Sequence, residues 1–262
     1  MRERIIFGLL LLPPAVFLLL QGGLLLRVAL LGISLIALSE LYRTLFAHST
    51  PLNWLGYIGV LAYFTFLEVA ISAFFVIFFG WVLLHLIYLV FHFDDLPIGD
   101  ALSYAVLPIY TAVSLSTVFL IHEANAVLVW VVVLSAWGSD TCCYFVGKWL
   151  GKTKLTKLSP NKTVEGSVGG VMGASLFGLA FYQFFPQVLP VGANQAWIVY
   201  VLVFAVLAAL SQLGDLVASA IKRQKGVKDF GALIPGHGGA MDRFDSILLT
   251  APFFYAFVYI LS

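Results

Sequence analysis

The sequence predicts an all-α fold, a polytopic bundle of transmembrane helices. Its 262 residues are 61% hydrophobic and only 10% charged, with a mean hydropathy of +1.02. A soluble domain carries about 25% charged residues, so this chain has too few charges to cover a water-facing surface. Lipid must be the solvent for most of it. The apolar segments are continuous rather than short and alternating, which argues against a β-barrel.

Each element is predicted from an apolar run, because a spanning helix needs about 20 apolar residues. The first run follows Arg2 and Arg4 and resembles a signal peptide, but another apolar run follows it instead of a soluble domain, and we interpret it as a helix that Pro13-Pro14 bends. The third and last runs are short, so the count is eight or nine. The nine predicted spans are 5–21, 23–46, 54–68, 70–92, 99–121, 126–148, 167–186, 196–221 and 246–261.

The loops predict the orientation. With nine spans, all Lys and Arg residues except Arg27 lie on one side, which the positive-inside rule makes cytoplasmic. The N-terminus is then inside and the C-terminus outside. We therefore expect an integral membrane protein, in a bacterial inner membrane, with any site built from these charges on the cytoplasmic face.

The two halves of the chain differ in kind. Residues 1–130 are apolar with sparse charges and are predicted to be N-terminal transmembrane helices, whereas residues 131–262 hold most of the polar motifs and are predicted to be a transmembrane catalytic region. The adjacent Cys142 and Cys143 are poorly placed to form a disulfide and are interpreted as packed thiols.

The first polar stretch lies inside a predicted helix and contains Asp140. A carboxylate in a transmembrane segment costs at least about 2.5 kcal/mol on insertion scales. Asp140 lies eight residues, or about two turns, before Lys148 at the interface. We expect it to face a polar cavity or a metal cation; a structural pair within the bundle is the alternative.

The second polar stretch is the loop 154–166. Its Ser-Pro-Asn segment breaks the helix and offers hydroxyl, amide and backbone groups, and the helix that begins near Glu165 offers amides to an anion. We interpret Lys154 and Lys157 more simply, as basic residues of a loop that lies near anionic lipid head groups. The candidate substrate-binding residues of this loop are Ser159, Asn161, Lys162 and Glu165.

The third polar stretch runs from Gly214 to Asp245. Asp215, Ser219 and Lys222 are spaced i, i+4, i+7 on one helix face, and Asp242 and Asp245 are spaced i, i+3 before the final span. Neighbouring carboxylates repel one another, and a hard divalent cation would relieve the repulsion. Oxygen ligands without clustered His or Cys indicate Mg²⁺ rather than zinc.

A glycine-rich loop precedes these aspartates and reads Pro-Gly-His-Gly-Gly over 235–239. Gly238 and Gly239 would let backbone amides approach a ligand closely, and His237 would either bind a phosphate or cap a helix. Carboxylates for a metal and cations for phosphates are what phosphoryl-type transfer needs. The sequence contains no Walker loop, kinase signature or visible acyl-transfer triad.

The residues from Ser219 to Asp245 resemble the signature of the phosphatidate cytidylyltransferase (CDP-diacylglycerol synthase) family. The matching segments are Ser219-Ala-Ile-Lys-Arg, Lys228-Asp-Phe-Gly, Ile234-Pro-Gly-His-Gly-Gly and Asp242-Arg-Phe-Asp, and the region from Asp140 to Gly170 is also similar. Ala218 stands where the family commonly has Glu, Phe230 where a small polar residue is expected, and Ala240 where a larger aliphatic is usual; Cys142 and Cys143 replace small residues.

The resemblance implies a reaction of CTP with phosphatidic acid that yields CDP-diacylglycerol and pyrophosphate. It implies Mg²⁺, leaves open a second, monovalent cation, suggests a homodimer and gives no role to nucleic acid. Implied metal ligands are Asp140, Asp215, Asp242 and Asp245. Implied catalytic residues are Asp215, Lys222, Arg223, Lys228, His237, Asp242, Arg243 and Asp245, and implied substrate-binding residues include Ser219, Gly238 and Gly239.

Other classes of membrane protein remain as alternatives. A transporter would need charges through both leaflets, and the outer loops here are nearly bare. A CDP-alcohol phosphotransferase would need an Asp-rich helix motif that the sequence lacks. A polyprenol kinase that uses CTP is the nearest alternative enzyme.

Overall fold

A computed structural model describes the backbone of residues 2–46, 48–189, 196–233 and 238–261, with side chains from residue 12 to 260 outside the same gaps. Over these ranges the regular structure is helical, which confirms the all-α prediction, and Lys154 and Thr163 form an isolated antiparallel β-bridge. The helices are α1 (Arg2–Gln21), α2 (Gly23–Leu45), α3 (Pro51–Thr65), α4 (Leu67–Ser72), α5 (Phe74–Phe91), α6 (Ile98–Ala124), α7 (Val129–Leu150), α8 (Val164–Phe184), α9 (Ala196–Gln224), α10 (Met241–Phe244) and α11 (Ile247–Leu261).

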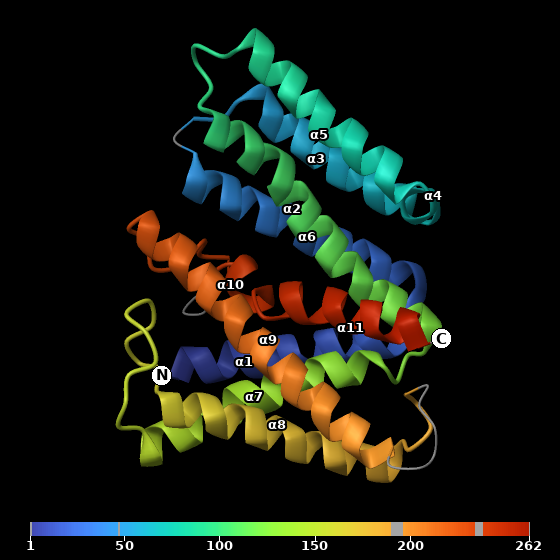
Figure 1. Ribbon diagram of the computed structural model, residues 1–262, viewed down its shortest axis with the longest axis vertical. Helices are drawn as coiled ribbons and strands as arrows, with labels where there is room; N and C mark the ends of the chain where they lie inside the picture. Colours follow the sequence, from blue (N-terminus) through green and yellow to red (C-terminus); the bar gives the residue numbers. More distant parts are fainter. Residues whose placement is uncertain (1, 47, 190–195, 234–237, 262) are drawn as a thin grey trace.

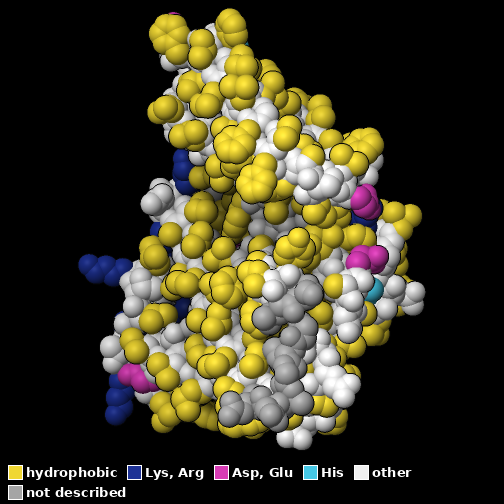
Figure 2. Space-filling view, turned by 45° about the vertical axis from the view of Figure 1, so that its right-hand side comes forward, with side chains coloured by type: hydrophobic (Ala, Val, Ile, Leu, Met, Phe, Trp, Pro, Cys, Tyr) yellow, Lys and Arg dark blue, Asp and Glu magenta, His cyan; other side chains and the backbone are white. Residues whose placement is uncertain are grey.

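Six of these helices are long and apolar enough to cross a membrane, namely α2, α5, α6, α7, α8 and α9. Shorter apolar segments lie in α1 (Leu12–Gln21) and α11 (Ile247–Ile260). Apolar side chains cover most of the face in Figure 2, and Lys and Arg side chains project mainly from one edge. Only 6% of the most apolar window of α5 is buried, as expected of a helix that faces lipid.

The predicted spans 54–68 and 70–92 are wrong in their boundaries. Helix α3 begins three residues earlier, at Pro51, because the Thr50 N–H donates to the Asn53 side chain (2.6 Å) and Pro51 fits the first helical position. Phe66 and Ala73 then leave helical geometry, so the short α4 separates α3 from α5. Neither break carries a Gly or Pro signal, and the apolar sequence conceals both.

Figure 1 shows one group of helices at the top of the molecule and another at the bottom. Helices α3 and α5 lie against α6 at the top, with α4 linking them at one end, and α7, α8 and α9 pack together at the bottom. Loops gather at two opposite ends. The start of α1, the loop 151–163 and the α10 region lie at the left in Figure 1, while α4, the α6–α7 link and the C-terminus lie at the right.

Close packing of α7, α8 and α9 depends on glycines of α8. A Cβ at Gly178 would lie 2.8 Å from the Tyr200 carbonyl oxygen on α9, and a Cβ at Gly170 would overlap the Cys143 sulfur on α7. Small residues of this kind let helix backbones approach closely where no hydrophobic effect drives them together. Cys142 and Cys143 are free, partly buried thiols, in agreement with the prediction.

Arg27, the exception to the charge bias, has partners of its own. Its guanidinium lies 2.8 Å from the Glu68 carboxylate on α4 and donates to the carbonyls of Phe64 (2.7 Å) and Thr65 (3.1 Å). The side chain therefore fixes the α3–α4 junction to α2.

Candidate active site

The loop between α7 and α8 is a folded hairpin rather than a loose basic loop. The Leu155 N–H donates to the Lys162 carbonyl (3.0 Å), and Ser159-Pro160-Asn161-Lys162 forms a tight turn in which the Lys162 N–H donates to Ser159 (3.0 Å). Glu165 accepts the N–H groups of Lys152 and Thr153 (both 3.1 Å). In this structure Glu165 therefore anchors the hairpin, while the half-buried Ser159 and the exposed Asn161 lie at its tip.

The hairpin presents Lys162 to α9, where its ammonium group forms an ion pair with Asp215. The two side chains are 29% and 28% exposed, so the pair lies at a boundary between protein and solvent rather than in the core. This contact joins two of the three polar stretches that the sequence singles out, across 53 residues of chain.

One turn before Asp215, Gln212 ties together the three helices beneath the hairpin. Its amide nitrogen donates to the Ser139 hydroxyl of α7 (3.0 Å) and to the Ser167 carbonyl of α8 (3.1 Å), and the Ser167 hydroxyl donates back to its oxygen. Gln212 is 6% exposed, and each of its polar atoms has a partner. Buried networks of this kind rigidify a site when every member is satisfied.

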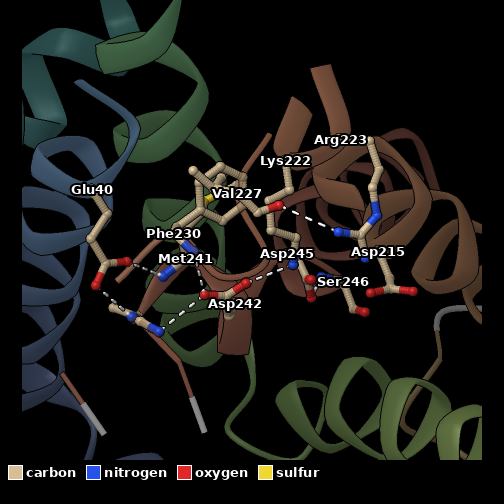
Figure 3. A network of polar contacts seen from close by, with 12 residues as sticks. Glu40, Asp215, Lys222, Arg223, Val227, Phe230, Met241, Asp242, Asp245 and Ser246 are labelled. Carbon is tan, nitrogen blue, oxygen red and sulfur yellow. Dashed lines mark hydrogen bonds and ion pairs between the residues drawn. The ribbon is translucent and has the colours of Figure 1, made fainter. Parts of the chain in front are cut away.

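A second ion pair joins Lys222 of α9 to Asp242 of α10 at 2.6 Å (Figure 3). Each residue is 9% exposed. The second Asp242 oxygen accepts the N–H groups of Phe230 (2.8 Å) and Gly239 (3.0 Å). Because Asp242 is engaged on both oxygens, it organises the segment around it in this structure, and its predicted role as a metal ligand stays a prediction.

The glycine-rich loop approaches carboxylates. Gly238 has φ 83°, a conformation that favours glycine, and a Cβ there would lie 2.8 Å from an Asp242 oxygen. A Cβ at Gly239 would overlap the carboxylate of Glu40 on α2. His237 lies outside the described residues. The sequence predicts that the backbone of this loop approaches a ligand closely. In the structure the groups that it approaches are the carboxylates of Asp242 and Glu40.

Asp245 is a buried carboxylate whose surroundings disfavour its charged form. It is 6% exposed and accepts the N–H of Ser246 (2.7 Å). Burial, the largest cause, and the negative charges of Asp215 and Asp140 together raise the pKa of Asp245 to about 7. These three carboxylates, from α9, α7 and the α10–α11 junction, therefore act on one another.

The donors fit Mg²⁺ in kind. They are hard carboxylate oxygens. A cation would offset both the burial of the Asp245 charge and its repulsion by Asp215 and Asp140. Over the described ranges, however, no three side chains from His, Cys, Asp and Glu lie close enough to hold one ion. Asp215 is held by Lys162 instead. Mg²⁺ binding by Asp140, Asp215 and Asp245 therefore stays a prediction.

The other predicted residues surround these pairs. Ser219 is buried on α9 between Asp215 and Lys222. Arg223 donates to the carbonyls of Leu158 in the hairpin and Val227 (both 3.4 Å), and Lys228 and Arg243 are exposed. Figure 3 shows Arg223 directed away from Asp242 and toward Val227.

The departures from the family pattern have structural explanations in two cases. Ala218 is 1% exposed within the hydrophobic core, so a glutamate at this position would require different packing around it. Phe230 is buried, with its ring centroid 5.3 Å from the Lys222 ammonium group, and provides a cation–π contact to the Lys222–Asp242 pair.

Sequence reasoning missed Glu40. This α2 residue is 5% exposed, and its two oxygens accept the N–H groups of Ala240 (3.0 Å) and Met241 (2.8 Å). The available signal was an acidic residue inside an apolar span, the same signal that singled out Asp140. Its partners lie 200 and 201 residues away, beyond the reach of any local pattern.

The sequence is similar to known proteins. Residues 2–261 match the model of the cytidylyltransferase family. Phosphatidate cytidylyltransferases of Synechocystis and Bacillus subtilis are 47% and 49% identical over 127 and 120 residues, which are 48% and 45% of this chain and 41% and 42% of theirs. The Staphylococcus saprophyticus protein of the same name is 43% identical over 120 residues, 45% of this chain and 44% of its own.

The matched region thus spans about two fifths of the length of these curated relatives. The family match, in contrast, runs through almost every residue from α1 to α11. The chain belongs to the cytidylyltransferase family.

Proposed function

We propose that this protein transfers the cytidylyl group of CTP to phosphatidic acid, forming CDP-diacylglycerol and pyrophosphate in phospholipid biosynthesis. The observation that carries the proposal is the convergence of the three polar stretches at one end of the bundle, where Lys162 pairs with Asp215 and Gln212, one turn before Asp215, donates to Ser139 beside Asp140. The full-length family match and the names of the bacterial relatives support the choice of nucleotide and lipid.

In this reaction a phosphate oxygen of phosphatidic acid attacks the α-phosphorus of CTP, and the bond from that phosphorus to the β-phosphate oxygen breaks. The attacking oxygen is already anionic, so the main barrier is the approach of two polyanions. Lys162, Lys222, Arg223, Lys228 and Arg243 supply the positive charge at this end of the protein. Arginine can bind phosphate with two parallel hydrogen bonds, which also fixes its orientation.

Asp140, Asp215 and Asp245 would hold Mg²⁺, which when bound supplies neutralisation of the triphosphate charge. In the described structure Lys162 takes that place beside Asp215. Release of Asp215 would leave the Lys162 ammonium group free to meet a phosphate, so one movement would prepare both the acidic and the basic half of the site. A second, monovalent cation is compatible with the same oxygen-rich surroundings.

The charge bias of the loops supports nine spans with the N-terminus and the active site cytoplasmic. We propose the inner membrane of a bacterial cell as its location. Phosphatidic acid would then enter sideways from the cytoplasmic leaflet, keeping its acyl chains in hydrocarbon. We further propose a homodimer, on the family resemblance.

Two differently labelled forms of CTP test the reaction. Purified protein in detergent, given phosphatidic acid and Mg²⁺, should transfer label from α-³²P-CTP into the lipid and release γ-³²P label as pyrophosphate. A lipid kinase that uses CTP would give the opposite result, with γ-label in the lipid. Absence of α-label from the lipid under every divalent cation tried would exclude the proposal.

The matched variants are Asp215→Asn at the site and Glu68→Gln at the opposite end of the bundle. Asn has the shape of Asp but no charge to offer a metal, so turnover should fall by about a hundredfold or more. The exposed Glu68 should tolerate the same chemical change with little loss, since exposed ion pairs contribute about 0–1 kcal/mol.

A further inference from the structure

Glu40 is a buried carboxylate on a membrane helix that reaches into the signature segment. We propose that Glu40 is a positioning residue for the active site: it holds the backbone at residues 240 and 241, and through it Asp242 and Asp245. The inference rests on the proposed cytidylyl transfer and adds to it a residue from the N-terminal half of the chain. Glu40 touches no substrate in this proposal and acts through the residues it holds.

The contacts of Glu40 are directed entirely at backbone. One carboxylate oxygen accepts the Ala240 N–H at 3.0 Å and the other accepts the Met241 N–H at 2.8 Å. Among the described side chains, no Lys, Arg or His forms an ion pair with Glu40. A carboxylate that is 5% exposed is costly unless hydrogen bonds compensate it. These two N–H groups therefore account for its stability there.

The segment is shaped to receive this side chain. A Cβ at Gly231 or at Gly239 would overlap the Glu40 carboxylate. Gly231 precedes the glycine-rich loop and Gly239 is its last residue, so two separate backbone positions lie against the Glu40 carboxylate. Any side chain at these positions would displace the carboxylate from the Ala240 and Met241 amides.

Consecutive amides are divided between two carboxylates (Figure 3). The Gly239 N–H donates to Asp242, whereas the next two N–H groups donate to Glu40. A shift of Glu40 therefore moves the peptide groups that also fix Asp242 and its partner Lys222. Asp245 lies three residues further on, one turn along the same backbone, and would move with them.

The position of Glu40 on α2 makes it a rigid support. Helix α2 is a 23-residue apolar helix that packs on α6, and Glu40 lies near its end on the side of the bundle that holds the site. Active-site groups are held most accurately when regular elements support them. The N-terminal half, which the sequence predicts only as apolar spans, would thus contribute directly to the geometry of the site.

The kinetic test compares Glu40→Gln with Glu68→Gln. Gln at residue 40 keeps the size but places an NH₂ group against one of the two backbone N–H groups. We expect kcat/KM for CTP to fall about tenfold to a hundredfold, with a raised KM for CTP. Glu68→Gln removes a carboxylate of equal size at the other end and should stay within about twofold. A lower yield of folded protein would not raise KM.

Hydrogen exchange provides a readout that does not depend on activity. In Glu40→Gln, peptides covering 238–246 should exchange faster, and peptides from α9 should exchange as in the unaltered protein. Unchanged exchange in 238–246 together with an unchanged KM for CTP would overturn the inference. If the unaltered protein transfers no cytidylyl group, the proposed function fails, while the exchange comparison still tests the hold of Glu40 on this segment.

Glu40→Asp covers the case in which Glu40→Gln does not fold. Asp keeps the charge but is shorter by one methylene, so it cannot reach both amides without a backbone shift. It should show faster exchange in 238–246 and a raised KM for CTP. A folded Glu40→Asp protein with ordinary KM and exchange would equally overturn the inference.

Discussion

Asp245 shows how a single residue couples the site to pH. Its pKa rises from 3.8 to about 7 on folding, first through burial and then through the charges of Asp215 and Asp140. A raised carboxylate pKa means that the folded state binds the proton more tightly than the unfolded state. The contribution of Asp245 to stability is therefore greatest below about pH 4 and is lost as pH rises toward 7, by up to about 4 kcal/mol.

We therefore expect Asp245→Asn to stabilise the metal-free protein, and to do so more at pH 8 than at pH 5. Asn removes the buried charge while keeping the shape of the side chain. Thermal unfolding in detergent with EDTA measures the difference in Tm between the variant and the unaltered protein at each pH. A difference that is equal at both pH values, or larger at pH 5, would contradict this account of Asp245.

Lys222 and Asp242 form the most buried ion pair of the described region, and its loss should be costly. Lys222→Met would leave the Asp242 carboxylate buried with only two backbone N–H donors. Removing one partner of a buried pair typically destabilises a protein by about 3–5 kcal/mol. Lys225→Met is the matched control, since Lys225 is exposed and donates only to the Leu45 carbonyl. Equal Tm values for the two variants would show that the Lys222 pair contributes little.

At this scale the sequence predicts residue types well and residue partners poorly. Asp215, Lys222, Asp242 and Lys162 are all singled out by the sequence, and the structure brings them together in two pairs. Residue types alone do not predict that Asp215 pairs with Lys162 and Asp242 with Lys222. These pairs depend on the fold. Glu40 was missed for the same reason, since its partners follow from the packing of α2 on α10.

Helix α8 illustrates what determines structure at the level of the element. Its glycines lie against α7 and α9, whereas Gly80 on α5 has no atom within 4 Å of a built Cβ. Gly178→Ala should destabilise the protein by about 1–3 kcal/mol, because the new Cβ meets the Tyr200 carbonyl and backbone must move. Gly80→Ala should be neutral or stabilising, by up to about 1 kcal/mol, through helix propensity alone.

The two glycine variants are compared by Tm in the same detergent. Gly178→Ala should lower Tm and Gly80→Ala should leave it unchanged or raise it, although the chemical substitution is identical. If Gly178→Ala is as stable as Gly80→Ala, α8 and α9 do not pack as closely as the structure places them. The comparison thus tests the helix packing on which the Lys162–Asp215 contact depends.

Helix existence was predictable from apolar length, and helix boundaries were less so. The long runs that became α2, α6, α7 and α9 carry clear hydropathy and polar ends. The region 51–91 is apolar apart from isolated residues such as Glu68, and neither break, at Phe66 or at Ala73, carries a Gly or Pro. They arise where the chain reverses, close to the Arg27–Glu68 contact that only tertiary structure supplies.

The distribution of charge over the whole molecule combines topology with function. The loops gather at two opposite ends of the bundle, and the hairpin 151–163 lies at the end where α1 begins (Figure 1). If the positive-inside rule orients the chain, the Lys and Arg residues that set its topology are the same ones that are proposed to bind CTP. The apolar N-terminal half and the polar C-terminal half differ in composition, but both contribute to the site, because Glu40 of the first half accepts the Ala240 N–H of the second.

Cysteine accessibility tests this orientation in whole cells. With Cys142 and Cys143 replaced by Ser, single cysteines at the exposed Lys154 and Asn125 report the two ends of the bundle. A membrane-impermeant maleimide should label Asn125→Cys in intact cells and Lys154→Cys only after the membrane is opened. The reverse pattern would place the hairpin outside the cell, away from cytoplasmic CTP, and would exclude the proposed reaction in that orientation whatever the purified protein does in detergent.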